Sequence, residues 1–203
     1  MPVTGWVKCQ SCTGTNWSAL IGGETLLDGV ASPNDGSLNL HADPTSDYLE
    51  CLDYDFTAEG LIATDVIDGI EFECYGTTGI PHITPGNTMG VYVTLDGSTP
   101  ASAEKEFDCT GPGMQNDTLG SSTDPWGLSL TGTDVLTATF GFLIREGSNT
   151  AGSPNGGRRV DYERARIHYS AGTVTPATVM ASKNRRIPDI GAIRNKGLGE
   201  KTS

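Results

Sequence analysis

Short runs in which apolar and polar residues alternate are the feature that most constrains the fold of this chain. In "DGIEFECYG" the apolar Ile70, Phe72 and Cys74 alternate with polar residues, and "VDYERARIHY" repeats the pattern. A period of two places successive side chains on opposite faces of a β-strand. Each run therefore predicts a strand with one buried and one solvent-facing side.

Four further runs carry the same pattern, and turn-forming clusters separate them. They are "YLECLDYDF", "MGVYVTL", "TATFGFLI" and the more exposed "EKEFDC". The separators, such as "GTTGIPHITPGN" and "GPGMQND", draw on the 27 Gly and 11 Pro residues of the chain, which favour turns. Because no convincing amphipathic helix occurs, we expect an all-β fold, an antiparallel β-sandwich of jelly-roll-like form with extended termini.

The strand pattern also predicts which side chains meet in the core. In "YLECLDYDF", Leu52, Tyr54 and Phe56 are expected to share the buried face. Gly141, opposite the apolar face of its strand, suits a bulge or a close approach of two backbones. The side chains expected in one core are those of Leu52, Phe72, Val93, Phe140, Phe142 and Ile167.

Charge divides the chain into two parts. Residues 183–203 hold six of the 13 Lys and Arg residues but only two of the 25 Asp and Glu residues, which leaves residues 1–182 with a net charge of −16. The strand pattern also ends after Ala171. We therefore expect a sandwich domain at 1–171 and an extended basic arm at 172–203. The acidic body would repel phosphates, so nucleic-acid binding by the main domain is not expected.

Hydropathy argues against a membrane partner. The first residues, "MPVTGWVKCQSC", lack the basic and apolar segments of a signal peptide. No stretch approaches the ~18 consecutive apolar residues of a membrane-spanning helix. We therefore expect no membrane partner and expect synthesis in a cytoplasm.

The five cysteines are expected to be free thiols, because their number is odd and no secretory signal is present. Cys9 and Cys12 form a Cys-x-x-Cys pair, which is half of a zinc site. No second closely spaced pair of Cys or His completes it. We expect no structural zinc and no cofactor, with zinc as the alternative for this pair.

The sequence offers little for catalysis. No Gly-x-Ser-x-Gly, Walker or His-Glu-x-x-His motif occurs. The pairs Asp53/Asp55 and Glu71/Glu73 each share a strand face, but glycoside hydrolysis needs carboxylates that flank a cleft, and alternating acids on outer faces are usually solvated. Calcium bound by carboxylates of "HADPTSD" or "QNDTLGSSTD" is a further alternative. We expect no enzymatic activity.

Four segments between about residues 14 and 171 follow one another in a distinctive order. They are "NWSALIGGETLLDGVAS", "ATDVIDGIEFECYG", "STDPWGLSLTGTDVLTATFGFLI" and "RRVDYERARIHYSA". In this order they resemble a β-sandwich family of bacteriophage virion proteins and related bacterial surface proteins. The chain departs from the family at "LIATDVIDG", which lacks the Pro expected before that strand. The resemblance implies a fold and a particle context, and it implies no catalytic residues.

The Pro-Trp-Gly corner at 125–127 is expected to close the fold. Pro fixes φ, Gly permits a sharp bend, and the indole of Trp126 would cap one end of the sandwich beside Phe140 and Phe142. The alternative is an indole that faces solvent and stacks on a sugar, which applies also to Trp6 and Trp17.

The resemblance and the basic arm together predict a non-enzymatic virion structural protein of a bacteriophage, as a capsid decoration, head-fibre or tail-associated subunit. It would reach the virion after synthesis in the host cytoplasm, with major capsid or tail proteins and copies of itself as partners. The alternative is a carbohydrate-binding module or adhesin for host-surface glycans, and the two roles can coexist. The residues expected to bind partners combine charges with small apolar anchors: Arg185, Arg186, Ile187, Ile190, Ile193, Arg194, Lys196 and Lys201.

Overall fold

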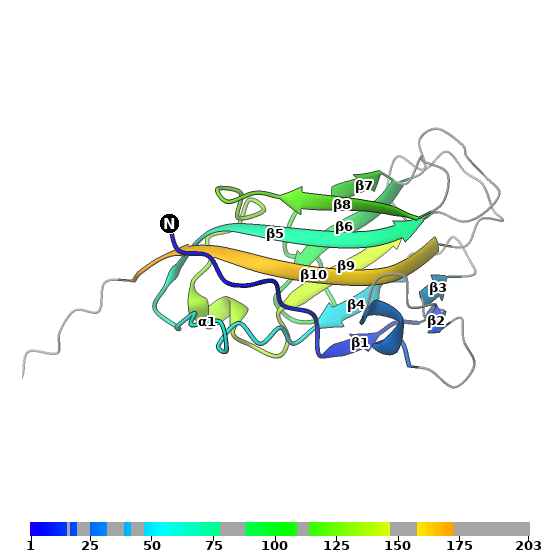
Figure 1. Cartoon of the computed structure of the whole chain (residues 1–203), viewed down its shortest axis with the longest axis horizontal. Coiled ribbons are helices and arrows are strands. Elements are labelled where there is room, and N and C mark those ends of the chain that lie inside the picture. The colour runs from blue at the N-terminus through cyan, green and yellow to red at the C-terminus, as the bar shows by residue number, and fades with distance from the viewer. Residues whose placement is uncertain are drawn as a thin grey trace, which may run out of the picture. The chain divides into compact units, whose positions relative to one another are not determined.

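Two five-stranded antiparallel sheets form the body of the protein (Figure 1). The computed structural model describes residues 1–15, 17–19, 25–31, 39–41, 47–77, 88–108, 114–146 and 158–172. The strands are β1 Ser11–Thr13, β2 Trp17–Ala19, β3 Asn39–His41, β4 Leu49–Leu52, β5 Val66–Thr77, β6 Thr88–Thr94, β7 Lys105–Asp108, β8 Gln115–Gly120, β9 Gly141–Glu146 and β10 Arg158–Ser170. A single 3-10 turn, Asp28–Val30, and one short helix, α1 Gly132–Val135, complete the assigned elements.

The two sheets are named here by their central strands. The β9 sheet has the order β1-β4-β9-β6-β7, and the β10 sheet has the order β2-β3-β10-β5-β8. Strands that follow one another along the chain often lie in different sheets, as β4 and β5 do, and this connects the two layers. The predicted fold class, an antiparallel β-sandwich, is confirmed.

The core lies between the sheets and contains most of the side chains that the strand pattern predicted. Phe72, Val93, Phe140, Phe142 and Ile167 are all fully buried and belong to one hydrophobic cluster. Phe142 lies in β9 and Phe140 directly precedes that strand, whereas Phe72 and Ile167 lie in the β10 sheet. These five predicted core positions are confirmed.

The prediction for Leu52 is wrong, because the alternation breaks at the residue that follows it. Asp53 adopts a left-handed backbone conformation with φ of 63°, and β4 ends at Leu52. Leu49 and Cys51 therefore carry the buried face of β4, and Leu52 lies outside the core cluster. Tyr54 and Phe56 are buried as expected, but they lie beyond the strand.

The segment "QNDTLG" forms β8 at one edge of the β10 sheet, although its first three residues belong to the expected turn "GPGMQND" and all six to a proposed calcium loop. Its register places Leu119 opposite Phe72 and Asp117 opposite Cys74. Leu119 is its one buried residue, and three of its polar residues face solvent. An edge strand can be this polar because only one side of it pairs with a neighbour.

The first residues of the chain cross from one sheet to the other. Val7 exchanges two backbone hydrogen bonds with Ala165 of β10, each 2.8 Å long, and Thr4 donates a third to the carbonyl of Ile167. Within "GWVK", the pairing with β10 is the isolated bridge between Val7 and Ala165. Beyond Gln10 the chain enters β1 of the β9 sheet (Figure 1).

The compact unit comprises Met1–Thr173. Beyond Gly172 the predicted arm lies outside the described residues, so its boundary and its partner-binding residues stay predictions. Within the described residues, no helix is long and apolar enough to span a bilayer.

Candidate functional site

Two ion pairs stand side by side on the outer face of the β10 sheet. The β5–β10 register places Arg164 opposite Glu73 and Arg166 opposite Glu71. Arg164 Nη2 lies 2.8 Å from Glu73 Oε1 and 3.0 Å from Oε2, and the Nε of Arg166 donates to Glu71 Oε2. His168 extends the row, with Nε2 3.3 Å from Glu71 Oε1. These five side chains are called the charged strip below.

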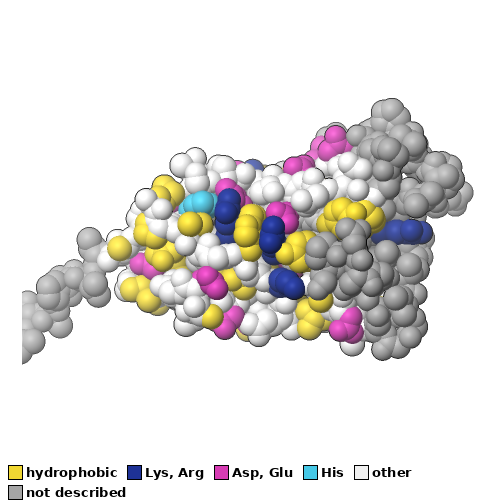
Figure 2. Space-filling model, viewed as in Figure 1, with side chains coloured by type: hydrophobic (Ala, Val, Ile, Leu, Met, Phe, Trp, Pro, Cys, Tyr) yellow, Lys and Arg dark blue, Asp and Glu magenta, His cyan; other side chains and the backbone are white. Residues whose placement is uncertain are grey.

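The indole of Trp6 packs against both arginines of the charged strip. The guanidinium carbons of Arg164 and Arg166 lie 4.6 and 4.5 Å from the ring centroid. Trp6 is partly exposed, and Figure 2 shows this face, where basic and acidic side chains alternate with apolar ones along the sheet. Such stacking is favourable and fixes the planes of the guanidinium groups.

The chemistry of the charged strip is that of an ordered, nearly neutral hydrogen-bonding surface. Two guanidinium and two carboxylate groups cancel in charge, and each is partly exposed. Tyr75, also partly exposed, and the exposed Asn116 lie next along the outward faces of β5 and β8. The surface presents hydrogen-bond donors and acceptors at fixed positions.

Trp126 closes the sandwich, as the structural interpretation of the Pro-Trp-Gly corner predicted. It is 3% exposed, its ring lies 5.7 Å from that of Phe142, and its Nε1 donates to the carbonyl of Ile70 at 3.0 Å. Trp126 itself, and not only Gly127, adopts positive φ at this corner. Trp17 is buried as well. Stacking on a sugar is therefore wrong for Trp126 and Trp17, and Trp6 is already stacked on arginines.

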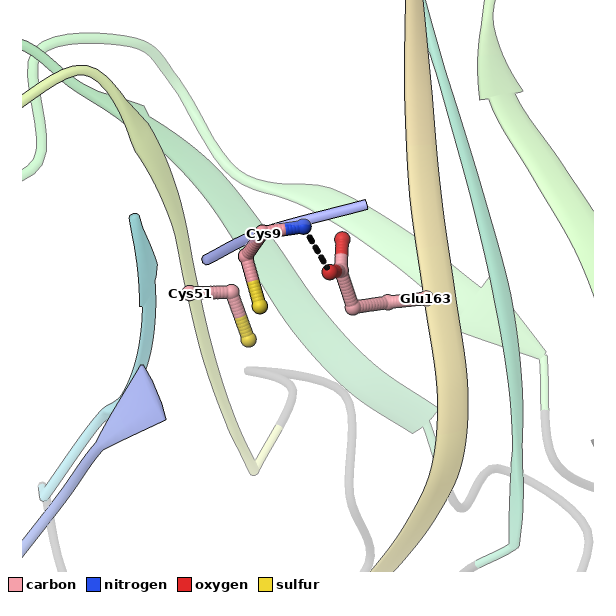
Figure 3. Close-up of side chains that lie close together, drawn as sticks. All are labelled: Cys9, Cys51 and Glu163. Carbon is pink, nitrogen blue, oxygen red and sulfur yellow. Dashed lines mark hydrogen bonds between the residues drawn. The ribbon is translucent and has the colours of Figure 1, made fainter. Parts of the chain in front are cut away.

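A second cluster of polar atoms lies buried between the sheets. Cys9, just before β1, Cys51 of β4 and Glu163 of β10 bring their ligand atoms within 4.8 Å of one another (Figure 3). Cys12, opposite Cys51 in the β1–β4 register, places its Sγ 3.9 Å from that of Cys51. Cys9 N–H donates to Glu163 Oε1 at 2.9 Å, and the Tyr54 hydroxyl donates to Oε2. These four residues, Cys9, Cys12, Cys51 and Glu163, are called the thiol cluster.

Hydrogen bonds among the thiols shift the pKa values of Cys9 and Cys12 in opposite directions. Hydrogen bonds from the thiols of Cys51 and Cys9 lower the pKa of Cys12 to about 6, whereas the hydrogen bond to Cys12 raises the pKa of Cys9 to about 12. Burial raises the pKa of Glu163 well above its ordinary value. Cys12 is thus the most acidic thiol of the cluster and the one that is partly exposed.

Two further features of the described residues, a proposed calcium loop and a shallow depression, contain carboxylates that form hydrogen bonds or ion pairs within the fold. Asp124, in one proposed calcium loop, accepts a hydrogen bond from Trp126 N–H at 2.9 Å and forms an ion pair with Lys105 at 2.7 Å. Both of its carboxylate oxygens therefore have partners within the protein. Most of the other loop, "HADPTSD", lies outside the described residues. A shallow depression of about 480 Å³ has one carboxylate, Asp68, which accepts a hydrogen bond from Ser170.

The thiol cluster is the grouping that the sequence pattern missed. Three of its members, Cys9, Cys51 and Glu163, form the one set of three or more Cys, His, Asp or Glu side chains among the described residues that lie close enough to share a metal ion. Glu163 could have been noticed, because it alternates in phase with the inward Ala165 and Ile167. The eight predicted partner-binding residues of the arm lie outside the described residues.

The geometry defines a β-sandwich with a polar outer face, and distant similarity to it is found among solved structures. A family 35 carbohydrate binding module from Clostridium thermocellum aligns with a TM-score of 0.40 and 15% identity over 81% of this chain and 98% of the module. The CBM22-1 xylan-binding domain of Paenibacillus barcinonensis Xyn10C aligns with a TM-score of 0.41 and 10% identity over 84% and 97%. No family model and no curated protein matches the sequence. Similarity at this level does not define a function for the chain.

Proposed function

We propose that this chain is a non-catalytic recognition module that binds a neutral glycan across the charged strip. The observation that carries the proposal is the pair of cross-strand ion pairs, Arg164–Glu73 and Arg166–Glu71, stacked under Trp6 on an outward sheet face. Cross-strand pairs of this kind stabilise a sheet by only about 0.2–1 kcal/mol each. Fold stability alone is therefore a weak reason for the whole arrangement.

Sugar hydroxyl groups both donate and accept hydrogen bonds, so a surface suited to them offers both functions at fixed spacing. The guanidinium groups of Arg164 and Arg166 supply planar donors, and the carboxylates beside them supply acceptors. The near-neutral strip, on a body with a net charge of −16 over residues 1–182, favours an uncharged ligand over a polyanion. Of the two functions expected from the sequence, this surface favours glycan recognition.

Replacing Trp6 by Ala is expected to weaken glycan binding at least about tenfold, because the two guanidinium groups lose the ring that orients them. The measurement is affinity electrophoresis and calorimetry against a panel of soluble neutral polysaccharides, with a sulfated polysaccharide as the charged comparison. The matched control is Tyr48→Ala. Tyr48 is also partly exposed and carries an arginine, Arg145, 5.2 Å from its ring centroid, but it precedes β4 of the other sheet. Equal loss in both variants, or binding only to the sulfated polymer, would contradict the proposal.

A second candidate, the virion structural role, rests on the charge partition of the chain. The basic segment 183–203, with a net charge of +4, follows a body of −16. In this proposal the arm binds an acidic groove on another copy or on a capsid or tail protein, with Ile187, Ile190 and Ile193 as apolar anchors between the charges. The protein would then reside in the virion.

Deleting residues 183–203 is expected to leave the melting curve of the sandwich unchanged and to abolish incorporation into particles. The sandwich keeps its core, because the core residues described above all precede residue 172. The measurement compares the melting temperature of the truncated protein with its occupancy on purified particles. Normal occupancy without the arm would remove this role and leave glycan recognition as the single candidate.

A further inference from the structure

The thiol cluster has the ligand types and nearly the spacing of a tetrahedral zinc site. With zinc–sulfur bonds of about 2.3 Å, two thiolates on one zinc lie about 3.8 Å apart. The sulfurs of Cys12 and Cys51 are separated by 3.9 Å. Cys9, Cys51 and Glu163 hold their ligand atoms within 4.8 Å of one another. Cys12 is not part of that group of three and contacts it through Cys51, so a four-ligand site requires the Cys12 side chain to rotate toward Cys9 and Glu163.

The carboxylate of Glu163 is the independent observation that points to a cation. Its side chain is fully buried in a core that is otherwise apolar or thiol-lined, and no ion pair involves it among the described residues. Its oxygens accept hydrogen bonds from Cys9 N–H and from the Tyr54 hydroxyl, and neither donor carries a positive charge. A buried carboxylate of this kind is costly unless a cation or a proton compensates it.

We propose that Cys9, Cys12, Cys51 and Glu163 bind one structural zinc ion. The three thiols and the Glu163 carboxyl group give up their protons to solvent as the metal binds. The hydrogen bonds from Tyr54 and from the backbone of Cys9 then orient the carboxylate as outer-sphere partners. Four protein ligands in a buried position leave no open site for substrate, which makes the role structural.

The position of the cluster explains what the zinc would do. Residues 3–7 run along β10 of one sheet, and β1 begins at Ser11 in the other sheet. Cys9 lies between them, Cys51 lies in the β9 sheet, and Glu163 lies in the β10 sheet. The ion would therefore fasten the crossing segment to both sheets. The sequence predicted no structural zinc because no second pair of ligands lies close to Cys9 and Cys12 in the chain. In the fold, Cys51 of β4 and Glu163 of β10 come close to Cys9 and would complete the ligand set.

The alternative to zinc binding is a disulfide between Cys12 and Cys51, which are paired opposite each other in β1 and β4. Their sulfurs are 3.9 Å apart and are not joined in a disulfide. A disulfide would account for two thiols but would leave Cys9 and the buried Glu163 without a cation. Zinc accounts for all four side chains.

The test uses the full chain, reduced and freed of metal, and titrated with cobalt(II) as a spectroscopic probe. We expect thiolate-to-cobalt charge-transfer absorption and tetrahedral ligand-field bands that saturate at one ion per chain and vanish when zinc displaces cobalt. Zinc should also raise the melting temperature by several degrees, and a chelator should reverse the rise. Absence of a saturating cobalt spectrum, or a Cys12–Cys51 disulfide in zinc-free protein purified without reductant, would overturn the proposal.

The matched variants are Cys51→Ala and Cys74→Ala. Both thiols are fully buried, and Cys74 lies opposite Glu163 in the β5–β10 register, yet its sulfur is not part of the cluster. We expect Cys51→Ala to lose the cobalt spectrum and Cys74→Ala to keep it. If Cys51→Ala fails to fold, Cys12→Ala at the partly exposed position takes its place. Glu163→Gln should weaken binding at least tenfold, and unchanged affinity in this variant would exclude the carboxylate as a ligand.

Discussion

Replacing Phe142 by Ala is expected to lower the free energy of unfolding by about 3–5 kcal/mol, the range for emptying a buried aromatic site. Phe142 is fully buried at the centre of an aromatic cluster. Its ring lies 4.3 Å from that of Phe72 and 5.6 Å from that of Tyr54. The cluster joins the two sheets, so the cavity would lie where neither sheet can collapse onto it. Denaturant unfolding of the purified variant measures the loss.

The control for this loss is Ile62→Ala, because Ile62 is a large apolar residue that is 54% exposed. We expect its unfolding free energy to stay within about 0.5 kcal/mol of the original. A Phe142→Ala protein as stable as this control would show that the inward assignment of β9 is wrong.

Replacing Gly141 by Ala is expected to cost about 3 kcal/mol, the upper end of the range for overfilled sites. Gly141 lies opposite Leu52 in the β4–β9 register. An added Cβ would overlap the carbonyl oxygen of Cys51 and lie 2.9 Å from the Cα of Leu52. Both obstacles are backbone atoms, so relief requires β4 and β9 to separate. Denaturant unfolding again measures the effect.

Gly60→Ala is the matched control, because at Gly60 the backbone conformation disfavours a side chain while the space for a Cβ is open. Gly60 has φ of 88°, yet an added Cβ there meets nothing within 4 Å. Its cost comes from backbone conformation alone, at about 1 kcal/mol. Equal losses at the two glycines would contradict the close approach of β4 and β9.

Alternation of apolar residues predicted the long strands β5, β9 and β10, because each has a buried apolar face, although Leu143 on the other face of β9 is buried as well. The strands that it missed lack such a face. β8 has one buried apolar residue, Leu119, and β1, β2 and β3 are each three residues long. Leu52 was misplaced because the left-handed conformation of Asp53 interrupts the period, and an Asp that adopts positive φ is not distinguished by sequence from one that does not.

The candidate sites depend on pairings between distant strands, and this limits what the sequence can predict. The alternation placed Arg164 and Glu73 on outer faces, but only the register made them partners. The Cys9–Cys12 spacing suggested half of a metal site, and the other half comes from β4 and β10. A local spacing rule identifies ligands on one loop, whereas these ligands are brought together by the packing of the two sheets.

The place of β10 in its sheet has a consequence for how the chain folds. It is the last strand of the described body, and it pairs with β5 on one side and with β3 and the first residues of the chain on the other. During synthesis, β5 and the N-terminal segment cannot form their full pairing with β10 until residue 170 has been added to the chain. Contacts of such long sequence separation make folding slow, in the range of milliseconds to seconds for β-sandwiches, and leave a strand edge open to aggregation meanwhile. The sandwich therefore closes as a late step, after nearly the whole body has left the ribosome.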